Sequence, residues 1–232
     1  MRKIAGVGGC KGGRFRVAGG ASDLVRALLA AVVFVGLAAC SAPPLTLDGG
    51  NESAKGWDYQ DLHRVWTRGS QLYRDFESIA SGEATFLSAS LVEGWLAEYE
   101  RIFKPLKEDL DGRRAHWNGL LANHECVMLA LTTQQREWND LASGNSMWKA
   151  YLTTNEGTRV SSTHATPMKL KDPTNRHFFP QVRVFYDGYT LCFPKMQSGT
   201  KVLGSGVTGF EVELRSTLGR LAFKWQLDAR GR

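Results

Sequence analysis

The stretch that decides the fold class is GFEVELRSTLGRLAFKWQL, residues 209–227, because apolar and polar side chains alternate along both of its halves. In the first half, Phe210, Val212 and Leu214 alternate with Glu211, Glu213 and Arg215. In the second half, Leu221, Phe223, Trp225 and Leu227 alternate with Ala222, Lys224 and Gln226. A period of two places one set of side chains in a core and the other in water. The stretch therefore predicts two antiparallel strands.

Just upstream, QVRVFYDGYTLCFP at residues 181–194 predicts another hairpin, with Asp187-Gly188 as its two-residue turn. In that register one face would carry Val182, Val184, Tyr186, Tyr189, Leu191 and Phe193. Weaker strand patterns cover residues 149–154 and 158–170. The sequence thus predicts an antiparallel β region over residues 148–232.

Between residues 57 and 147 the apolar residues recur instead with the period of a helix. The first run has its stripe at Leu62, Val65, Trp66, Leu72, Tyr73, Phe76 and Ile79. In the second run Ser90 and Glu93 have the spacing of a capping box, and Pro105 should kink or end the helix. The third runs from about residue 113 to 141. Three helices with short connections predict a small bundle, and helices followed by strands predict the α+β class.

The first 39 residues have the composition of an export signal. Basic residues prevail up to Arg26, and Ala27–Ala39 is an uncharged run of 13 residues. A membrane-spanning helix needs about 20 residues, so this run is too short for a stable anchor. A basic flank, a short apolar run and small residues at its end are typical of a secretory signal peptide.

The end of that run, Leu37-Ala38-Ala39-Cys40, resembles the lipobox of bacterial lipoproteins, and the resemblance covers only the first 41 residues. It implies that the Cys40 thiol carries diacylglycerol, that a peptidase cleaves between Ala39 and Cys40, and that the new amino terminus is acylated. Two or more acyl chains hold a protein firmly on a membrane. In Gram-negative sorting, aspartate directly after the lipidated cysteine retains a lipoprotein in the inner membrane. This chain has Ser41 at that position, which implies the outer membrane. The alternative is that Leu37–Cys40 ends a buried helix, which the basic flank disfavours.

Residues 40–56 contain Pro, Gly and polar residues, and we expect them to form a lipidated tether that holds the folded part away from the headgroups. The charge of +6 belongs largely to the signal peptide, because residues 1–39 hold six of the 29 basic residues and one of the 23 acidic ones. The mature chain is nearly neutral. Its charge and compartment therefore argue against nucleic acid as a partner.

Two cysteines stay after export and lipidation, Cys126 and Cys192. In an oxidising compartment an even pair is compatible with a disulfide, which would join the helical region to the β region. Two separate buried thiols are the alternative, since free cysteine is often buried.

Several patterns resemble catalytic or binding motifs but lack the neighbouring elements or the spacing that those motifs require. Gly204–Gly209 matches G-x-G-x-x-G, but a strand pattern follows where a helix should bind phosphate, which favours a turn between strands. His116 and His124 lie eight residues apart, too far on one helix for one metal ion. The acidic pairs Glu98/Glu100 and Asp109/Asp111 face different ways on helices. We therefore expect no metal site, no cofactor and no catalytic residues.

The segment KDPTNRHFFPQ, residues 171–181, is the candidate interaction site. Its members are Arg176, His177, Phe178 and Phe179. Exposed aromatic residues beside arginine are typical of interface hot spots. The interpretation we favour is that the two phenylalanines fill the seam between helices and sheet, because such pairs are seldom left in water.

These observations support a lipid-anchored cell-envelope protein of non-catalytic type that presents an α+β domain to protein or peptidoglycan partners. One alternative is an envelope protein with a small-ligand pocket between helices and sheet. A further alternative is an envelope hydrolase whose residues the sequence does not identify.

Overall fold

The structure is a computed structural model that describes Leu45 and residues 58–168 and 173–227. The lipidation and cleavage positions, Cys40 and Ala39, lie outside the described residues. The helices are α2 (Tyr59–Trp66), α3 (Ala89–Phe103), α4 (Lys107–Asn123) and α5 (Pro173–Phe178), with a 3-10 turn at Arg136–Trp138. Among the described helices, none is long and apolar enough to cross a membrane.

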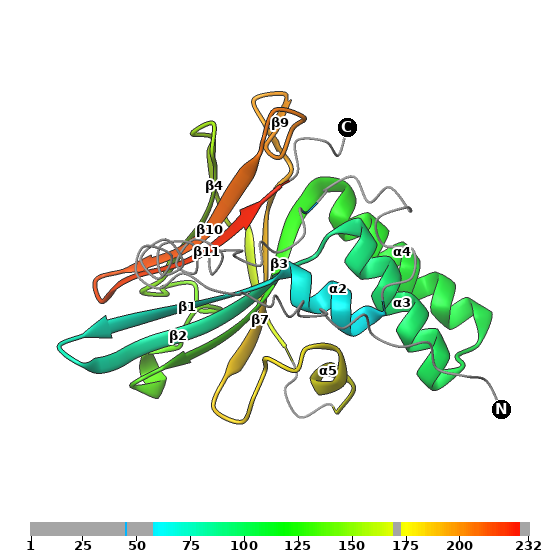
Figure 1. Cartoon of the computed structure of the whole chain (residues 1–232), viewed down its shortest axis with the longest axis horizontal. Coiled ribbons are helices and arrows are strands. Elements are labelled where there is room, and N and C mark those ends of the chain that lie inside the picture. The colour runs from blue at the N-terminus through cyan, green and yellow to red at the C-terminus, as the bar shows by residue number, and fades with distance from the viewer. Residues whose placement is uncertain (1–44, 46–57, 169–172, 228–232) are drawn as a thin grey trace, which may run out of the picture. The chain divides into compact units, whose positions relative to one another are not determined.

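The strands form two main antiparallel sheets (Figure 1). The first has the order β1-β2-β3-β7-β6 and consists of Thr67–Arg74, Glu77–Phe86, His124–Thr133, Asp187–Pro194 and His164–Pro167. The second has the order β11-β10-β4-β5 and consists of Gly219–Gln226, Gly209–Ser216, Lys149–Thr154 and Arg159–Ser161. A small hairpin, β8 (Met196–Gln197) with β9 (Thr200–Lys201), stands apart from both.

The predicted strands at residues 209–227 are confirmed as the β10–β11 hairpin, in which Val212 pairs with Phe223. Their apolar set is buried between the sheets, and the Phe210 and Trp225 rings stack with centroids 5.0 Å apart. Phe86, at the end of β2, packs against Phe210 with ring centroids 4.9 Å apart. The Trp225 indole N–H donates to the Trp66 carbonyl at 2.9 Å, which ties α2 to the same core.

The charged residues on the outer face of the second sheet form ion pairs with one another. Glu213 is buried there, and Arg159, Arg215 and Arg220 all form ion pairs with it. The hydrogen bonds from Arg215 are the main reason that the pKa of Glu213 lies below its usual range. Three guanidinium groups around one carboxylate provide the pairing that a buried charge requires.

The α+β class is confirmed, but the expected N-terminal three-helix segment is wrong. The first expected helix ends at Trp66, and β1 and β2 follow it. Asp75 and Phe76 form the turn between these strands with positive φ of 49° and 74°, a conformation usually signalled by Asn-Gly. No glycine marks this turn, and the three- and four-residue spacing of nearby apolar residues imitated a helix.

The third expected helix is also wrong, because α4 ends at Asn123 and residues 124–133 form β3. Six consecutive residues of β3, Cys126–Leu131, are buried, so this central strand contacts protein on both faces. A continuous apolar run does not distinguish a buried strand from a buried helix. Since β1, β2 and β3 share a sheet with β7 and β6, the boundary at residues 147/148 does not separate a helical region from a β region.

The hairpin predicted at 181–194 is wrong in its first arm. Residues 181–186, all described, form no strand, and Val184 and Phe185 are exposed. Asp187 and Gly188 lie inside β7, opposite Leu131 and Ala130 of β3. Because β3 and β6 occupy both edges of β7, a hairpin partner has no place there. The weaker patterns correspond to β4 at 149–154 and to β5 and β6 within 158–170.

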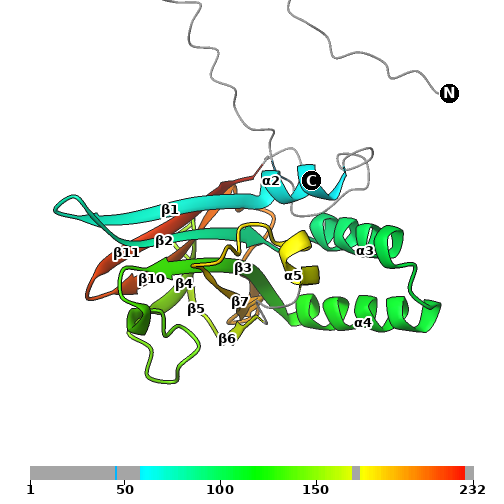
Figure 2. The same cartoon turned by 90° about the horizontal axis from the view of Figure 1, so that it is seen from below.

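The ends of the helices partly follow the sequence signals. Ser88, not Ser90, caps α3, because its hydroxyl accepts a hydrogen bond from the Leu91 amide at 3.2 Å. The break expected at Pro105 is confirmed, since α3 ends at Phe103 and α4 begins at Lys107. As Figure 2 shows, α3 and α4 lie side by side beyond one end of the sheets.

Cys126 and Cys192 are direct partners in the β3–β7 ladder, and their sulfurs form a disulfide. The bridge lies inside one sheet. The sequence had suggested that it would join a helical region to a β region, and it does not. It closes a loop with a sequence separation of 66, for which chain entropy gives about 4 kcal/mol of stabilisation.

The β1–β2 turn yields a stability prediction. Phe76 is fully exposed, so Phe76→Gly removes no packing. The substitution also relieves a left-handed backbone conformation, which is unfavourable for residues other than glycine by about 1–2 kcal/mol. We expect the substitution to raise the free energy of unfolding by about 1 kcal/mol in urea denaturation. Tyr73→Gly, in the strand next to the turn, should lower it instead. A loss of stability in Phe76→Gly would contradict the assigned turn.

Candidate functional site

The candidate site is a groove of about 720 Å³ between the α3–α4 pair and the β3–β7–β6 part of the first sheet. Three groups of side chains line it: aromatic residues, charged or polar residues, and two methionines from the sheet side. They are Trp95, Tyr99, Trp117 and Phe179; Glu108, Asp109, Arg113, His116, Asn175 and Thr190; and Met128 and Met168. The lining also includes Gly112 and Pro167.

Helical periodicity explains why the two helices present these side chains together. Trp95 and Tyr99 are four residues apart on α3, and Arg113, His116 and Trp117 occupy one face of α4. The Trp95 ring stacks on Tyr99 at 5.4 Å and meets Trp117 edge-on at 5.8 Å. The groove therefore has a continuous aromatic wall across both helices.

Charge of both signs lies beside this wall. The Arg113 guanidinium is 4.2 Å from the centre of the Tyr99 ring, in cation–π contact. Glu108 and Asp109 lie in the first turn of α4, where the helix dipole favours acidic side chains. The groove can thus contact a flat apolar surface and, next to it, groups of either charge.

Trp95 also has a buried hydrogen-bond donor without a partner among the described residues. Its side chain is only 8 % exposed, and its indole N–H meets no acceptor among the described residues. A buried donor without a partner is unfavourable by about 1–3 kcal/mol.

A three-residue cluster attaches α5 to α3 at the side of the groove. Arg101 donates two hydrogen bonds to Glu98 at 2.7 Å, and His177 Nε2 lies 3.1 Å from the same carboxylate. These hydrogen bonds, that from Arg101 first, lower the pKa of Glu98 to about 2. Because Phe179 directly follows α5, this attachment helps to position Phe179 in the lining.

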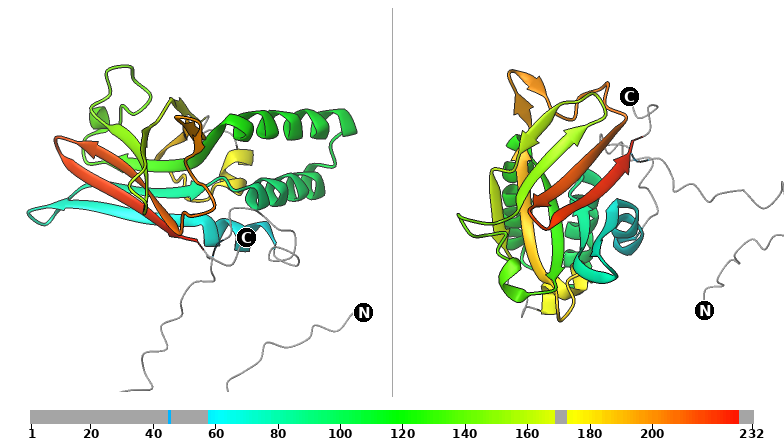
Figure 3. Two further views of the ribbon diagram at one scale, coloured as in Figure 1. Left: turned by 90° about the horizontal axis from the view of Figure 1, so that it is seen from above. Right: turned by 90° about the vertical axis from the view of Figure 1, so that its left-hand side faces the viewer.

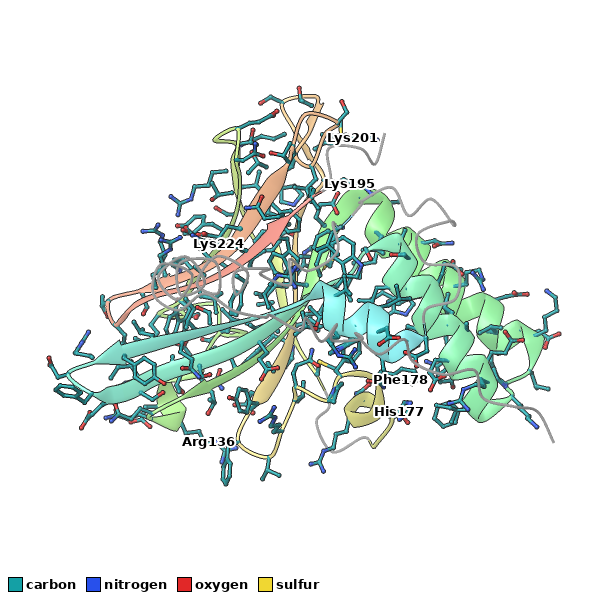
Figure 4. All side chains as sticks on the ribbon, viewed as in Figure 1. Arg136, His177, Phe178, Lys195, Lys201 and Lys224 are labelled. Atoms are coloured by element: carbon teal, nitrogen blue, oxygen red, sulfur yellow. A yellow bond between two sulfur atoms is a disulfide. The ribbon has the colours of Figure 1, made fainter. Side chains whose placement is uncertain are left out.

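The expected interface at Arg176, His177, Phe178 and Phe179 is wrong for the two aromatic residues. Phe178 and Phe179 are 1 % and 5 % exposed, whereas Arg176 and His177 are exposed. The Phe178 ring packs against Trp95, and its carbonyl accepts a hydrogen bond from the Tyr59 hydroxyl. Figure 4 shows His177 and Phe178 on α5, next to α2 and α3. The burial that the favoured interpretation requires is confirmed, and rings from α2 and α3 pack around Phe178.

The other sequence motifs do not assemble into a site. His116 lines the groove, whereas His124 begins β3 and its ring lies 5.3 Å from that of His164. The glycines of 204–209 form a turn that leads into β10, not into a helix. Within the described ranges no three His, Cys, Asp or Glu side chains lie close enough to share a metal ion.

A buried polar cluster beneath α2 was not predicted from the sequence. His63 is buried, and its Nε2 lies 3.3 Å from the Thr85 hydroxyl, to which the Gln181 amide donates at 2.9 Å. Burial lowers the pKa of His63, which favours the neutral ring. The cluster joins α2, β2 and the segment after α5. We interpret it as structural, since its members do not line the groove.

Glu125 is another titratable group that the sequence did not identify as unusual. It lies on β3 with its side chain 12 % exposed, and Lys195 Nζ is 4.0 Å away. Burial is the main influence and raises the pKa of Glu125 to about 7, although Lys195 and Lys201 act in the opposite direction. Its position in a continuous apolar strand could have been the signal, because buried carboxyl groups have raised pKa values.

Comparisons with known proteins add little to this geometry. No protein-family model matches the chain, and no curated protein sequence matches it. Among solved structures, the chain is similar to a crystal structure at 1.90 Å described as a novel protein of unknown function from Burkholderia pseudomallei K96243. That similarity has a TM-score of 0.40 and 11 % identity, and it covers 80 % of this chain and 91 % of the other.

Glu125 gives a pH-dependent stability prediction. Its folded pKa lies above the ordinary value of 4.5, so its contribution to stability is fully present below about pH 4.5 and is lost as pH rises through 7. Glu125→Gln resembles the protonated form at every pH. We expect this variant to exceed the native chain in unfolding free energy by a margin that grows to about 3 kcal/mol by pH 8.

Chemical denaturation at pH 5, 6, 7 and 8 measures that margin. Lys195→Met is the second variant, because it removes a nearby cation that lowers the pKa of Glu125. It should shift the loss of stability to higher pH. A margin for Glu125→Gln that does not vary with pH would be inconsistent with the burial of this carboxyl group.

Proposed function

We propose that the mature chain is a lipid-anchored protein of the bacterial cell envelope that binds a small ligand in the α3–α4 groove. The groove carries the proposal, because its volume of about 720 Å³ lies in the range of small-molecule sites. Its lining combines aromatic and other apolar side chains with charged and polar ones, and small-molecule sites likewise use polar groups beside apolar surface to orient a ligand. The anchor rests on the resemblance of Leu37–Cys40 to a lipobox.

The lining favours a ligand with a flat apolar face and charged groups beside it. Trp95, Tyr99 and Trp117 offer ring surfaces, and Arg113 can pair with a carboxylate. Glu108 and Asp109 can pair with an amine. Peptidoglycan fragments combine sugar rings with carboxylates and amines, so we propose a fragment of this class as the ligand.

The cysteine pairing supports the envelope compartment. Cys126 and Cys192 are both buried and joined as a disulfide. Disulfides form and persist in oxidising compartments such as the bacterial periplasm. A chain exported past the inner membrane would acquire this bridge there.

Arg113→Ala tests the groove, with Arg114→Ala as the matched control. Arg113 lines the groove, whereas the neighbouring Arg114 pairs with Glu93 and does not line it. Because Trp95 and Trp117 lie in the wall, tryptophan fluorescence should report binding of soluble peptidoglycan fragments. We expect Arg113→Ala to weaken that binding about tenfold or more, since hydrogen bonds to charged groups contribute about 1.5–3 kcal/mol.

Equal affinity in both variants would place the ligand elsewhere. Unchanged fluorescence and thermal stability of the native chain across the fragment series would refute peptidoglycan as the ligand class. Both variants should unfold at similar temperatures, because each removes one exposed or half-exposed side chain.

Presentation to a protein partner is the second candidate, and one observation favours it. Val184 and Phe185 are adjacent, exposed and apolar, in the segment between α5 and β7. Adjacent exposed apolar residues are typical of contact surfaces. Crosslinking in intact cells should then capture a specific envelope protein with the native chain and lose it with Val184→Ser/Phe185→Ser. Capture that this double substitution does not affect would contradict this surface.

A further inference from the structure

Leu45 shows how the domain is held relative to its lipid anchor. It lies within the expected tether 40–56, yet it is only 4 % exposed and belongs to the hydrophobic core. It forms a parallel bridge with Leu227, directly after β11. Thus the folded part of the mature chain includes Leu45 and does not start only at α2.

This contact limits the distance between the domain and the membrane, on the premise of the proposed function that Cys40 carries the lipid. Five residue steps separate Cys40 from Leu45, and an extended chain spans at most about 3.6 Å per residue. The reach is therefore at most about 18 Å. A free tether as far as Tyr59 would reach more than three times as far. On this premise the domain lies closer to the headgroups than the expected tether would allow.

Hydrogen bonds show which surface lies near Leu227. Its amide donates to the Thr208 carbonyl at 2.8 Å, so the turn at residues 204–208 lies beside it. The Asn155 side chain accepts hydrogen bonds from the Thr208 and Gly209 amides, which adds the β4–β5 turn to the same end. The exposed members of these turns include Ser205 and Glu156.

The β8–β9 hairpin lies at this end of the molecule too, near the top of Figure 1 and of the right-hand view in Figure 3. Met196 and Lys201 are direct partners in it, and both are exposed. Figure 4 shows Lys201 and Lys195 close to this end. An exposed methionine next to a lysine suits the boundary between acyl chains and anionic headgroups.

We propose that the end of the second sheet formed by Leu227, the 204–208 turn and the β8–β9 hairpin faces the lipid bilayer, and that Leu45 holds it there. The opposite end of β11 then faces away from the membrane. That end carries the β10–β11 turn with Thr217, and Arg74 of the β1–β2 hairpin donates to the Leu218 carbonyl at 3.0 Å. The eight residues of β11 separate the two ends by about 27 Å.

The test compares two exposed turn residues at opposite ends of this sheet, Ser205 and Thr217. Ser205→Cys and Thr217→Cys are labelled with an environment-sensitive fluorophore in the full-length, lipidated protein. The protein is placed in phosphatidylethanolamine–phosphatidylglycerol vesicles that contain nitroxide lipids. We expect quenching at residue 205 to exceed that at residue 217 at least about threefold. The native cysteines do not interfere, because Cys126 and Cys192 are bridged and buried.

Two further changes test the role of Leu45. Leu45→Ser should release residue 45 from the core and reduce quenching at residue 205 to the level at residue 217. Leu45→Ile should leave the quenching at residue 205 unchanged. In case Leu45→Ser impairs folding, insertion of twelve Gly/Ser residues between Ser41 and Ala42 lengthens the reach without altering Leu45. That insertion should also abolish the difference between the two labels.

The outcomes separate this inference from the anchor itself. Mass spectrometry of the mature N-terminus and detergent-phase partitioning show whether Cys40 is lipidated, with Cys40→Ala as the control. Absence of lipid would overturn the anchor and, with it, this orientation. A lipidated, membrane-bound protein with equal quenching at both labels would overturn the orientation alone, and so would an insertion that leaves the difference intact.

Discussion

The arrangement of the whole domain depends on the antiparallel pairing of β2 with β3. Two residues connect the end of β2 to α3, and α4 leads directly into β3, whose first residue His124 also ends the helix. Because β2 and β3 are neighbours in the sheet, the two helices leave it side by side. The aromatic wall of Trp95, Tyr99 and Trp117 therefore follows from the strand register as much as from the helices themselves.

The buried and half-buried carboxylates show how local pairing determines charge in this fold. Glu213 and Glu98 each receive hydrogen bonds from an arginine, and their pKa values are lowered. Lys195 Nζ lies 4.0 Å from the carboxylate of Glu125, and its effect on the pKa of Glu125 is smaller than that of burial. The first two carboxylates fasten elements to one another, as Glu98 does for α5 and α3, whereas burial raises the pKa of Glu125.

Sequence periodicity predicted the parts of the fold in which local and tertiary preferences agree. The β10–β11 hairpin has clean alternation because one face meets the core and the other meets water. Periodicity failed at β3, whose two buried faces remove the alternation, and at the Asp75–Phe76 turn, which lacks a glycine. Of the groove, the sequence suggested only a pocket between helices and sheet. Its lining residues come from six helices and strands and the segments next to them, and only tertiary packing brings Trp95 and Thr190 together.

The direct junctions between β2, α3, α4 and β3 make the helical pair an insertion within a β-hairpin. Without residues 89–123, the neighbouring strands β2 and β3 would need only a tight turn to connect them. In chain topology the helical pair is therefore an insertion between neighbouring strands, and Lys104–Leu106, between α3 and α4, is a position at which chain length can change without altering strand register. Evolution or design could thus change the length of the connection between α3 and α4 while the pairing of β2 with β3 stays the same.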